Sequence, residues 1–254
     1  MTAAMYRLPT GSLTHTAPGD TLTLTGDEKH HAVTVKRTTE GENILLADGS
    51  GLVAHAEVTT ITEAELSARV TTITNDSYPG PRFILVQALA KGDRDLQAIE
   101  AATELGVDEI IPWQSRRAIV QWKGPRAEKA LRKWQSQVEA AAKQSRRPHT
   151  PTVQPHVSST SNHLGDIARH ADLALVLHED ATTPITTISL PSSGNIALFV
   201  GPEGGISPEE IDMLTDAGAT PVHMGRYVLR ASSAGPAAIA ALSCQQRWNT
   251  PPTM

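Results

Sequence analysis

The chain has 254 residues and a formal net charge of −5, with 39% hydrophobic and 19% charged residues, which is the composition of a soluble globular protein. No apolar run reaches the ~18 residues of a membrane span, the first residues lack a signal-peptide core, and the single cysteine, Cys244, excludes a disulfide framework. We therefore expect a cytoplasmic protein that is not in a membrane, with one large domain or two smaller ones.

The first part of the chain has the pattern of short β-strands. Alternating or short apolar runs occur at residues 21–25, 32–36, 43–47, 52–58 and 66–73. The turn Asp48-Gly49-Ser50-Gly51 separates the third and fourth runs as in a β-hairpin. So many short strands predict a small β-barrel. The turn-forming residues between Asn75 and Pro81 predict a boundary between a domain at 1–74 and a second at 78–254.

The rest of the chain alternates apolar strands with amphipathic helices. Strands are expected at residues 83–90, 107–111, 173–177, 196–200 and 221–224. Helices are expected from Asp93 or Asp95 to Leu105, from Pro125 through Ala142, from Pro208, and from about 233 to 247, while residues 147–165 have a loop composition. This order predicts an α/β domain, a mostly parallel sheet with helices on both faces, whose ligands bind at the C-terminal ends of the strands.

Basic residues are concentrated between Trp113 and His149. Ten arginines and lysines stand there against two acidic residues, so the segment carries +8 and the remainder of the chain −13. A cationic segment on an acidic molecule is typical of a site for a polyanion such as RNA. A solvated helix face is the alternative. Trp113 and Trp122 are better explained as core residues than as residues that stack on RNA bases.

The run from Leu198 to Ser207, LFVGPEGGIS, predicts a loop that binds a small molecule. An apolar strand ends in a Gly-Pro turn, a carboxylate and two further glycines, and Ser207 and Pro208 then begin a helix. Because glycine has no side chain, a ligand can lie directly on main-chain N–H and C=O groups. An ordinary strand–helix connection is the alternative.

A second loop, Gly225–Arg230, places the apolar Val228 and Leu229 between arginines and just before a helix. It is either a capped helix start or a loop that lays apolar backbone against a planar ligand and directs Arg230 to a substrate oxygen. The sequence contains no dinucleotide-binding glycine motif, no P-loop and no nucleophile elbow, and its ten histidines lack the spacing of metal ligands. We therefore expect no metal.

Together these motifs resemble the RsmE-type methyltransferases of the SPOUT superfamily. The matching segments are Lys91-Gly92, Glu104-Leu105-Gly106-Val107, the helix from Trp134 to Arg147, Leu177-His178, Gly201–Gly205, and Gly225 with Val228-Leu229-Arg230. The resemblance implies a PUA-like β-barrel that binds RNA, an α/β domain with a trefoil knot, S-adenosylmethionine bound in the knot, and an obligate homodimer. The implied reaction is methylation of N3 of a uridine in 16S ribosomal RNA of the small subunit.

The resemblance also implies roles for individual residues. Those that it assigns to the cofactor are Leu177, His178, Gly201, Pro202, Glu203, Gly204, Gly205, Met224, Gly225, Val228, Leu229 and Ala234. Arg230 is the catalytic candidate, which would stabilise the negative charge that develops on the pyrimidine oxygens; a salt bridge from Arg230 to Glu203 is the alternative. Phosphate contacts are expected from Arg7, Lys91, Arg94, Arg116, Arg117, Lys123, Arg146 and Arg147.

The chain departs from the family pattern within the second loop. Where the family usually has arginine, this chain has Tyr227, and where it has Thr-Glu-Thr, this chain has Ala231-Ser232-Ser233. A carboxylate that could act as a base is thus a serine. A non-catalytic RNA-binding or ribosome-assembly factor is the alternative function. A third, an enzyme that binds a nucleotide phosphate at Gly201–Gly205, is disfavoured by Glu203 and by the lack of a nearby lysine.

Overall fold

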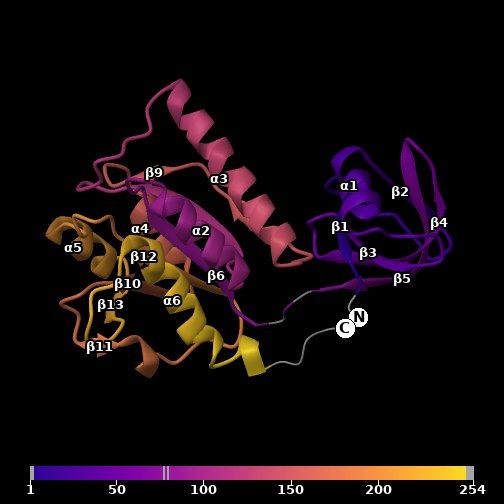
Figure 1. Ribbon diagram of the computed structural model, residues 1–254. Coiled ribbons are helices and arrows are strands. Elements are labelled where there is room, and N and C mark those ends of the chain that lie inside the picture. Colours follow the sequence, from indigo (N-terminus) through magenta and orange to yellow (C-terminus); the bar gives the residue numbers. More distant parts are fainter. Residues whose placement is uncertain (1–2, 77, 79, 250–254) are drawn as a thin grey trace. The chain divides into compact units, whose positions relative to one another are not determined.

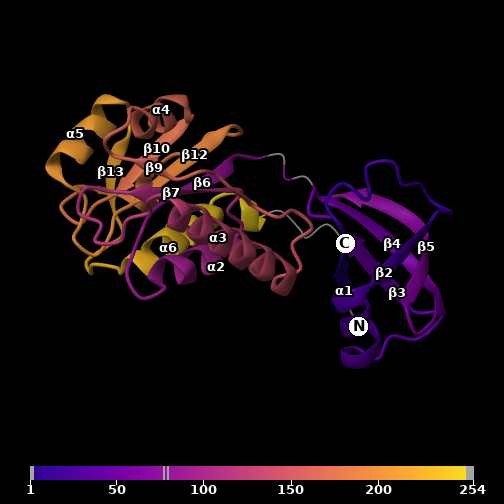
Figure 2. The same ribbon diagram turned by 90° about the horizontal axis from the view of Figure 1, so that it is seen from above.

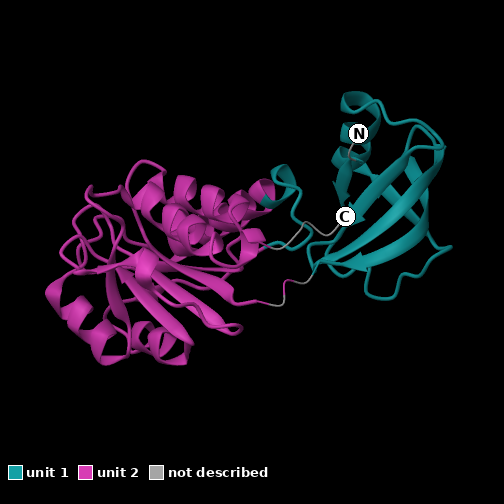
Figure 3. Ribbon diagram, turned by 90° about the horizontal axis from the view of Figure 1, so that it is seen from below, with its two compact units in different colours: residues 1–77, 142–150 teal, residues 78–141, 151–254 magenta. Residues whose placement is uncertain are grey.

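Figure 1 shows a computed structural model of the protein, which describes residues 3–76, 78 and 80–249. The chain forms two compact units, one of Met1–Ser77 and Ala142–Thr150, the other of Tyr78–Ala141 and Pro151–Met254 (Figure 3). The division expected from the sequence assigned 142–150 to the second domain. In the first unit, the Arg7 guanidinium donates hydrogen bonds to the carbonyls of Arg147 and Pro148, at 2.9 and 3.3 Å. These bonds fasten the later segment to the first unit.

The first unit is built on a mixed β-sheet. Its described strands are β1 (Met5–Arg7), β2 (Thr21–Thr25), β3 (Asn43–Ala47), β4 (Leu52–Ile61) and β5 (Glu65–Asn75). They follow the order β1-β3-β4-β5-β2, with β1 parallel to β3 and the other pairs antiparallel. The sheet curves into a half-barrel (Figure 3) around a core that includes Tyr6, Leu24 and Leu46.

One predicted strand of this unit is a helix. Residues 32–36 lie in and directly after the π-helical turn η1 (His31–Val35), which continues α1 (Gly26–His30). The strand prediction is wrong because the helix starts further upstream, where Asp27 and Glu28 occupy the first turn and favour a helix N-terminus. The β-branched residues that suggested a strand, within His31–Val35, belong to the helical turn that continues α1.

The second unit is a parallel α/β domain. Its described strands are β6 (Arg82–Ala88), β7 (Glu109–Gln114), β8 (Thr152–Val153), β9 (Val157–Ser158), β10 (Leu173–Leu177), β11 (Thr183–Pro184), β12 (Asn195–Val200) and β13 (Thr220–His223). Their order is β11-β13-β10-β12-β6-β7-β8, with β9 paired to β7. These pairings are parallel.

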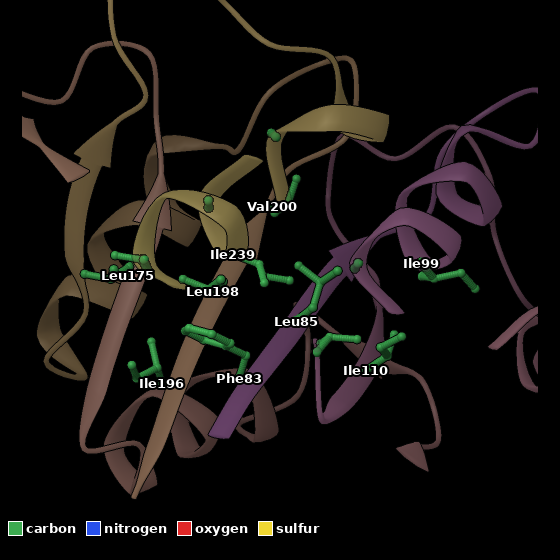
Figure 4. Packing of buried hydrophobic residues seen from close by; sticks show 14 of the residues in the cluster. Phe83, Leu85, Ile99, Ile110, Leu175, Ile196, Leu198, Val200 and Ile239 are labelled. Carbon is green, nitrogen blue, oxygen red and sulfur yellow. The ribbon is translucent and has the colours of Figure 1, made fainter. Parts of the chain in front are cut away.

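Helices cover both faces of this sheet. They are α2 (Arg94–Glu104), α3 (Pro125–Gln144), α4 (His163–His170), α5 (Pro208–Asp216) and α6 (Ala231–Ser243), with short 3₁₀ turns η2 (Ile185–Thr187) and η3 (Arg247–Asn249). Figure 2 shows α2, α3 and α6 on one face and α4 and α5 on the other. Leu85 packs with Ile99 and Ile239 on the first face (Figure 4), whereas its neighbour Val86 packs with Leu214 on the second.

The predicted fold class, a parallel α/β domain preceded by a small β domain, is confirmed. Trp113 and Trp122 are buried, which confirms their interpretation as core residues. The loop predicted at 147–165 instead contains β8, β9 and the start of α4, because its short strands pair with β7. The last long helix runs from Ala231 to Ser243 rather than from 233 to 247. Among the described residues, no helix has the length and apolar character needed to cross a membrane.

Candidate functional site

Three neighbouring strands of the parallel sheet end at one cavity. In the sheet, β10 lies between β13 and β12, and the loops that follow these strands line a cavity of about 890 Å³. The loops contain residues 178–180, 201–206 and 224–230. Ligand sites in proteins usually have roughly 300–1,000 Å³, so this cavity has room for a small molecule and part of a second substrate.

Every residue predicted to bind a cofactor lines this cavity. They are Leu177, His178, Gly201, Pro202, Glu203, Gly204, Gly205, Met224, Gly225, Val228, Leu229 and Ala234. Arg230, the catalytic candidate, and two predicted RNA-binding residues, Arg94 and Arg117, line it as well. The structure thus brings these residues together, while their individual roles stay predictions. Lining residues for which the sequence predicted no role in binding include Glu179, Asp180, Asp212, His223, Arg226 and Tyr227.

Glu203 fastens the loop at 201–207 to the turn before α2. Its carboxylate accepts a hydrogen bond from the Arg94 guanidinium at 2.9 Å and one from the Lys91 N–H at 3.3 Å. Burial raises the pKa of Glu203, but hydrogen bonds from its own N–H, Arg94 and Lys91 outweigh burial and lower that pKa below its ordinary value. The alternative in which Arg230 pairs with Glu203 is wrong, because Arg94 is the partner.

Glycines let the same loop fold tightly against its neighbours. The Arg117 guanidinium donates a hydrogen bond to the Gly204 carbonyl at 3.2 Å. A Cβ at Gly204 would lie 3.3 Å from the Cβ and carbonyl oxygen of Arg117, and a Cβ at Gly201 would lie 2.6 Å from the Cγ1 of Ile206. A side chain at Gly201 would displace Ile206, and one at Gly204 would require a small shift of Arg117, so glycine at both positions keeps the loop in this tight conformation.

Glu210, at the start of α5, is the buried anchor of this loop. Its side chain is 0% exposed. It accepts hydrogen bonds from the Ser207 and Arg116 N–H groups, each at 2.8 Å, and from the Ser159 hydroxyl, which in turn accepts one from the Trp113 indole at 2.8 Å. A single carboxylate thus joins the end of the loop to the segments after β7 and β9.

The sequence indicated the helix start at Ser207 but not this wider role of Glu210. The local part is visible: Ser207 and Glu210 form a capping box, in which each side chain satisfies the other's backbone N–H. Ser159 and Arg116 stand 51 and 94 residues away in the chain. No local pattern connects residues at such separations.

The loop at 224–230 is held in a different way. Gly225 has φ +112°, a conformation that glycine adopts readily, and its N–H donates to Nδ1 of His223 at 3.1 Å. The next apolar side chains are open to solvent: Tyr227 is 78% exposed, Val228 73% and Leu229 38%. No side chain of this stretch anchors it as Glu203 and Glu210 anchor the other loop, within the hydrogen bonds and ion pairs of the described residues.

The backbone of Arg230 helps to start α6, whereas its side chain is exposed and can bind a ligand. Its carbonyl accepts hydrogen bonds from the N–H groups of Ser233 and Ala234, both at 2.9 Å, at the start of α6. Its guanidinium is exposed and, within the part of the chain that the structure describes, takes part in no salt bridge. The charge of Arg230 is therefore available to a ligand in the cavity.

The residues predicted to contact RNA divide between the two units. Arg7, Arg146 and Arg147 belong to the first unit, and Lys91, Arg94, Arg116, Arg117 and Lys123 to the second. Arg7 already donates to two carbonyls, and Arg94 to Glu203. Lys91, Arg116 and Lys123 are exposed. The basic segment at 113–149 thus crosses from one unit to the other, and its RNA contacts remain a prediction.

No metal centre is built from the residues described: none of their His, Cys, Asp and Glu side chains gather in groups of three or more that could hold an ion. The expectation of a metal-free site is unchanged by this finding and stays a prediction.

The two units match known protein domains. Residues 78–243 match the family described as an RNA methyltransferase domain, and residues 24–71 match the RNA methyltransferase PUA domain. The cavity lies within the first of these matches. Fold, site and domain order are therefore those of an RNA methyltransferase with a PUA domain.

Individual relatives cover nearly the whole chain. Ribosomal RNA small subunit methyltransferase E of Mycobacterium bovis is 40% identical over 227 residues, which cover 88% of this chain and 87% of the relative. The Bacillus subtilis protein of the same name is 30% identical over 233 residues, 89% and 90% of the two chains. A crystal structure of this methyltransferase from Neisseria gonorrhoeae, bound to S-adenosylmethionine, matches with a TM-score of 0.80 and 29% identity over 96% of this chain and 98% of that one. The chain belongs to the ribosomal RNA small subunit methyltransferase E family, and the resemblance seen in the sequence is confirmed.

Proposed function

We propose that the protein transfers the methyl group of S-adenosylmethionine to N3 of a uridine in the 16S RNA of the small ribosomal subunit. The observation that carries this proposal is the cavity at the ends of β10, β12 and β13, which is lined by every residue that the family resemblance assigns to the methyl donor. The names of the relatives, and the donor bound in the Neisseria gonorrhoeae structure, support the same reaction.

The cavity suits the chemistry of the methyl donor. An adenine ring needs an apolar wall with main-chain polar groups close by, and Leu177, Val228 and Leu229 offer both. A Cβ at Gly201 would lie 2.6 Å from Ile206, so the chain presents bare backbone there. Ribose hydroxyls need acceptors, which carboxylates on the cavity wall such as Asp180 supply. When bound, the donor supplies a methyl group on a positively charged sulfur.

The protein's own contribution is positioning and electrostatic stabilisation. Uridine N3 carries a proton, and its loss leaves negative charge on the pyrimidine oxygens O2 and O4. We assign the stabilisation of that charge to Arg230, whose exposed guanidinium lines the cavity. The N-terminal end of α6, beginning at Ala231 in the cavity wall, adds the positive end of a helix dipole. Because residue 232 is serine, we assign the proton to solvent.

RNA binding and assembly extend this proposal. We propose that Lys91, Arg116, Arg117 and Lys123 hold RNA phosphates beside the cavity, and that Arg7, Arg94, Arg146 and Arg147 contribute further contacts. Each lost phosphate contact would lower the slope of log K against log salt by about one. A homodimer and a trefoil knot are retained as proposals from the resemblance alone, and a cytoplasmic location is retained as a proposal from the composition of the sequence.

Mass spectrometry of ribosomal RNA from cells with and without the gene tests the reaction. One uridine in the small-subunit RNA is expected to lose its methyl group without the gene and to regain it with the wild-type chain, and to regain it more slowly with Arg230→Ala. An identical modification map in both cells would contradict the reaction. Calorimetry then tests the non-catalytic alternative, which requires that the protein fail to bind S-adenosylmethionine at millimolar concentration.

A further inference from the structure

Aromatic side chains in this protein are mostly core residues, and Tyr227 is the exception at the cavity. The chain has four Trp, three Tyr and two Phe, all within the described residues. The buried ones are Tyr6, Phe83, Trp113, Trp122, Trp134 and Phe199. Tyr227 is 78% exposed, against 54% for Trp248, and of these aromatic residues only Tyr227 lines the cavity. An aromatic ring left in water at a binding site indicates a surface that a ligand covers.

A guanidinium group lies beside this ring. The Cζ of Arg226 lies 5.9 Å from the centre of the Tyr227 ring, within the range of a cation–π contact. Neither Arg226 nor Arg230 forms a salt bridge with any residue that the structure describes. The segment 224–231 contains no acidic residue. Both guanidinium groups are therefore available to an anionic ligand.

We infer that Tyr227 stacks on an unpaired base of the RNA substrate while Arg226 neutralises a neighbouring phosphate, an inference that rests on the proposed function and adds to it a base-binding residue. Stacking on aromatic rings and pairing with cations are the two general means by which proteins hold single-stranded RNA.

Two other ligands for the ring fit the observations less well. The methyl donor is assigned to the backbone of Val228 and Leu229, whereas the ring of Tyr227 is the most exposed aromatic side chain of the described chain. A second copy of this chain would have to bring carboxylates to Arg226 and Arg230 and a flat apolar group to the ring at the same place, whereas a single nucleotide carries both a base and a phosphate. A polyanion with flat bases accounts for the ring and both cations together.

Binding of the full-length chain to a fluorescently labelled single-stranded oligouridylate tests this inference. Tyr227→Ala is expected to weaken binding roughly 5- to 150-fold, whereas Tyr227→Phe and Tyr227→Trp keep most of the affinity because they keep a ring. Tyr227→Ala removes no charge, so the slope of log K against log salt stays as in the wild type, while Arg226→Ala lowers that slope by about one. Trp248→Ala is the matched control, because it removes an exposed aromatic side chain that does not line the cavity.

Three outcomes would overturn the stacking role. Tyr227→Ala binds the oligouridylate as tightly as the wild type; it loses S-adenosylmethionine affinity by the same factor, which would place the ring on the donor; or it changes the sedimentation behaviour of the protein, which would place the ring between two copies. Methyl transfer by the wild-type chain to small-subunit RNA separates this test from the proposed function. If the wild type methylates and Tyr227→Ala binds RNA normally, the stacking inference alone fails.

Discussion

The two loops that form most of the cavity wall are held in opposite ways. The loop at 201–207 is fastened by side chains: Glu203 binds Arg94 and the Lys91 N–H, and the buried Glu210 binds the loop's end at Ser207. The loop at 224–230 ends at the start of α6, where the Arg230 carbonyl accepts backbone hydrogen bonds, and it leaves the side chains of Tyr227, Val228 and Leu229 exposed. The first wall of the cavity, the loop at 201–207, is thus held in place without a ligand. The second wall, the loop at 224–230, leaves its side chains exposed to solvent.

This difference indicates that the two walls contribute to the binding of different ligands. A wall fixed by the Glu203–Arg94 ion pair and the buried Glu210 carboxylate has little conformational entropy to lose on binding, which favours a small ligand of constant shape such as the methyl donor. A wall with exposed apolar and cationic side chains gains most of its contacts only when a larger partner covers it. We therefore expect substitutions in the first wall to act on stability and donor affinity, and substitutions of the exposed side chains in the second to act on RNA binding and the transfer step, while the backbone of the second wall still contributes to donor binding.

Glu210→Ala is expected to have the largest effect, because it removes the most deeply buried anchor of the first wall. It leaves the N–H groups of Ser207 and Arg116 and the Ser159 hydroxyl without their buried acceptor. We expect the free energy of unfolding to fall by about 4 kcal/mol, measured by urea denaturation. Donor affinity, measured by calorimetry at low temperature, should fall with it.

Glu209→Ala is the matched control for this prediction. Glu209 stands in the same first helical turn but is exposed, and its carboxylate interacts with the Ser207 side chain outside the buried network of Glu210. Its denaturation midpoint should stay close to that of the wild type. Equal losses for both variants would show that charge at the helix start, rather than the buried network, stabilises the first wall.

Arg230→Ala is expected to have the next largest effect, on the reaction rather than on stability. Without the guanidinium, the rate of methyl transfer in a single turnover should fall about 100-fold, which corresponds to roughly 3 kcal/mol of transition-state stabilisation. Calorimetry should give an unchanged affinity for S-adenosylmethionine, because the backbone cap of α6 is kept. A loss of donor affinity equal to the loss of rate would mean that Arg230 holds the donor instead.

The same contrast explains what could be predicted from the sequence. Strands 43–47 and 173–177 coincide with β3 and β10, and both glycine-containing loops were found, because these features depend on neighbours in the chain. The partners of Glu203 and Glu210 were not found, because Arg94 and Ser159 come from distant segments. The helix at 26–35 was missed because local β-branched alternation was given more weight than the acidic helix start upstream.

Comparing Gly225→Ala with Gly218→Ala separates the effect of backbone strain on stability from a direct effect on donor binding. Both glycines have positive φ, +112° and +96°, and a Cβ would meet nothing within 4 Å at either. Each substitution should cost roughly 1–2 kcal/mol of stability through strain alone. Gly225 lines the cavity and Gly218 does not, so only Gly225→Ala should also weaken donor binding in calorimetry. Equal donor affinities would exclude Gly225 from the binding surface.

Asp95→Asn is expected to have the smallest effect, and it tests whether the turn that supports the first wall depends on charge. Asp95 is buried and accepts hydrogen bonds from the N–H groups of Leu96 and Ala90, in the turn whose Lys91 and Arg94 hold Glu203. Burial raises the pKa of Asp95 above its ordinary value despite these bonds. Protonation of this side chain therefore stabilises the folded state, and that contribution is present below the unfolded pKa of about 3.9 and is lost as the pH rises through the folded pKa.

Asparagine resembles the protonated acid, so Asp95→Asn should be slightly more stable than the wild type at pH 7, and the difference should vanish as the pH falls towards 4. Thermal midpoints measured across this range check the sign. Donor affinity at pH 7 should be unchanged, because asparagine keeps an acceptor oxygen for the Leu96 N–H at 2.9 Å, and the contact that it loses, from the Ala90 N–H, is the longer one at 3.5 Å. A variant less stable than the wild type at pH 7 would mean that the negative charge itself holds the turn, and the first wall would then depend on electrostatics at its base as well as at Glu203.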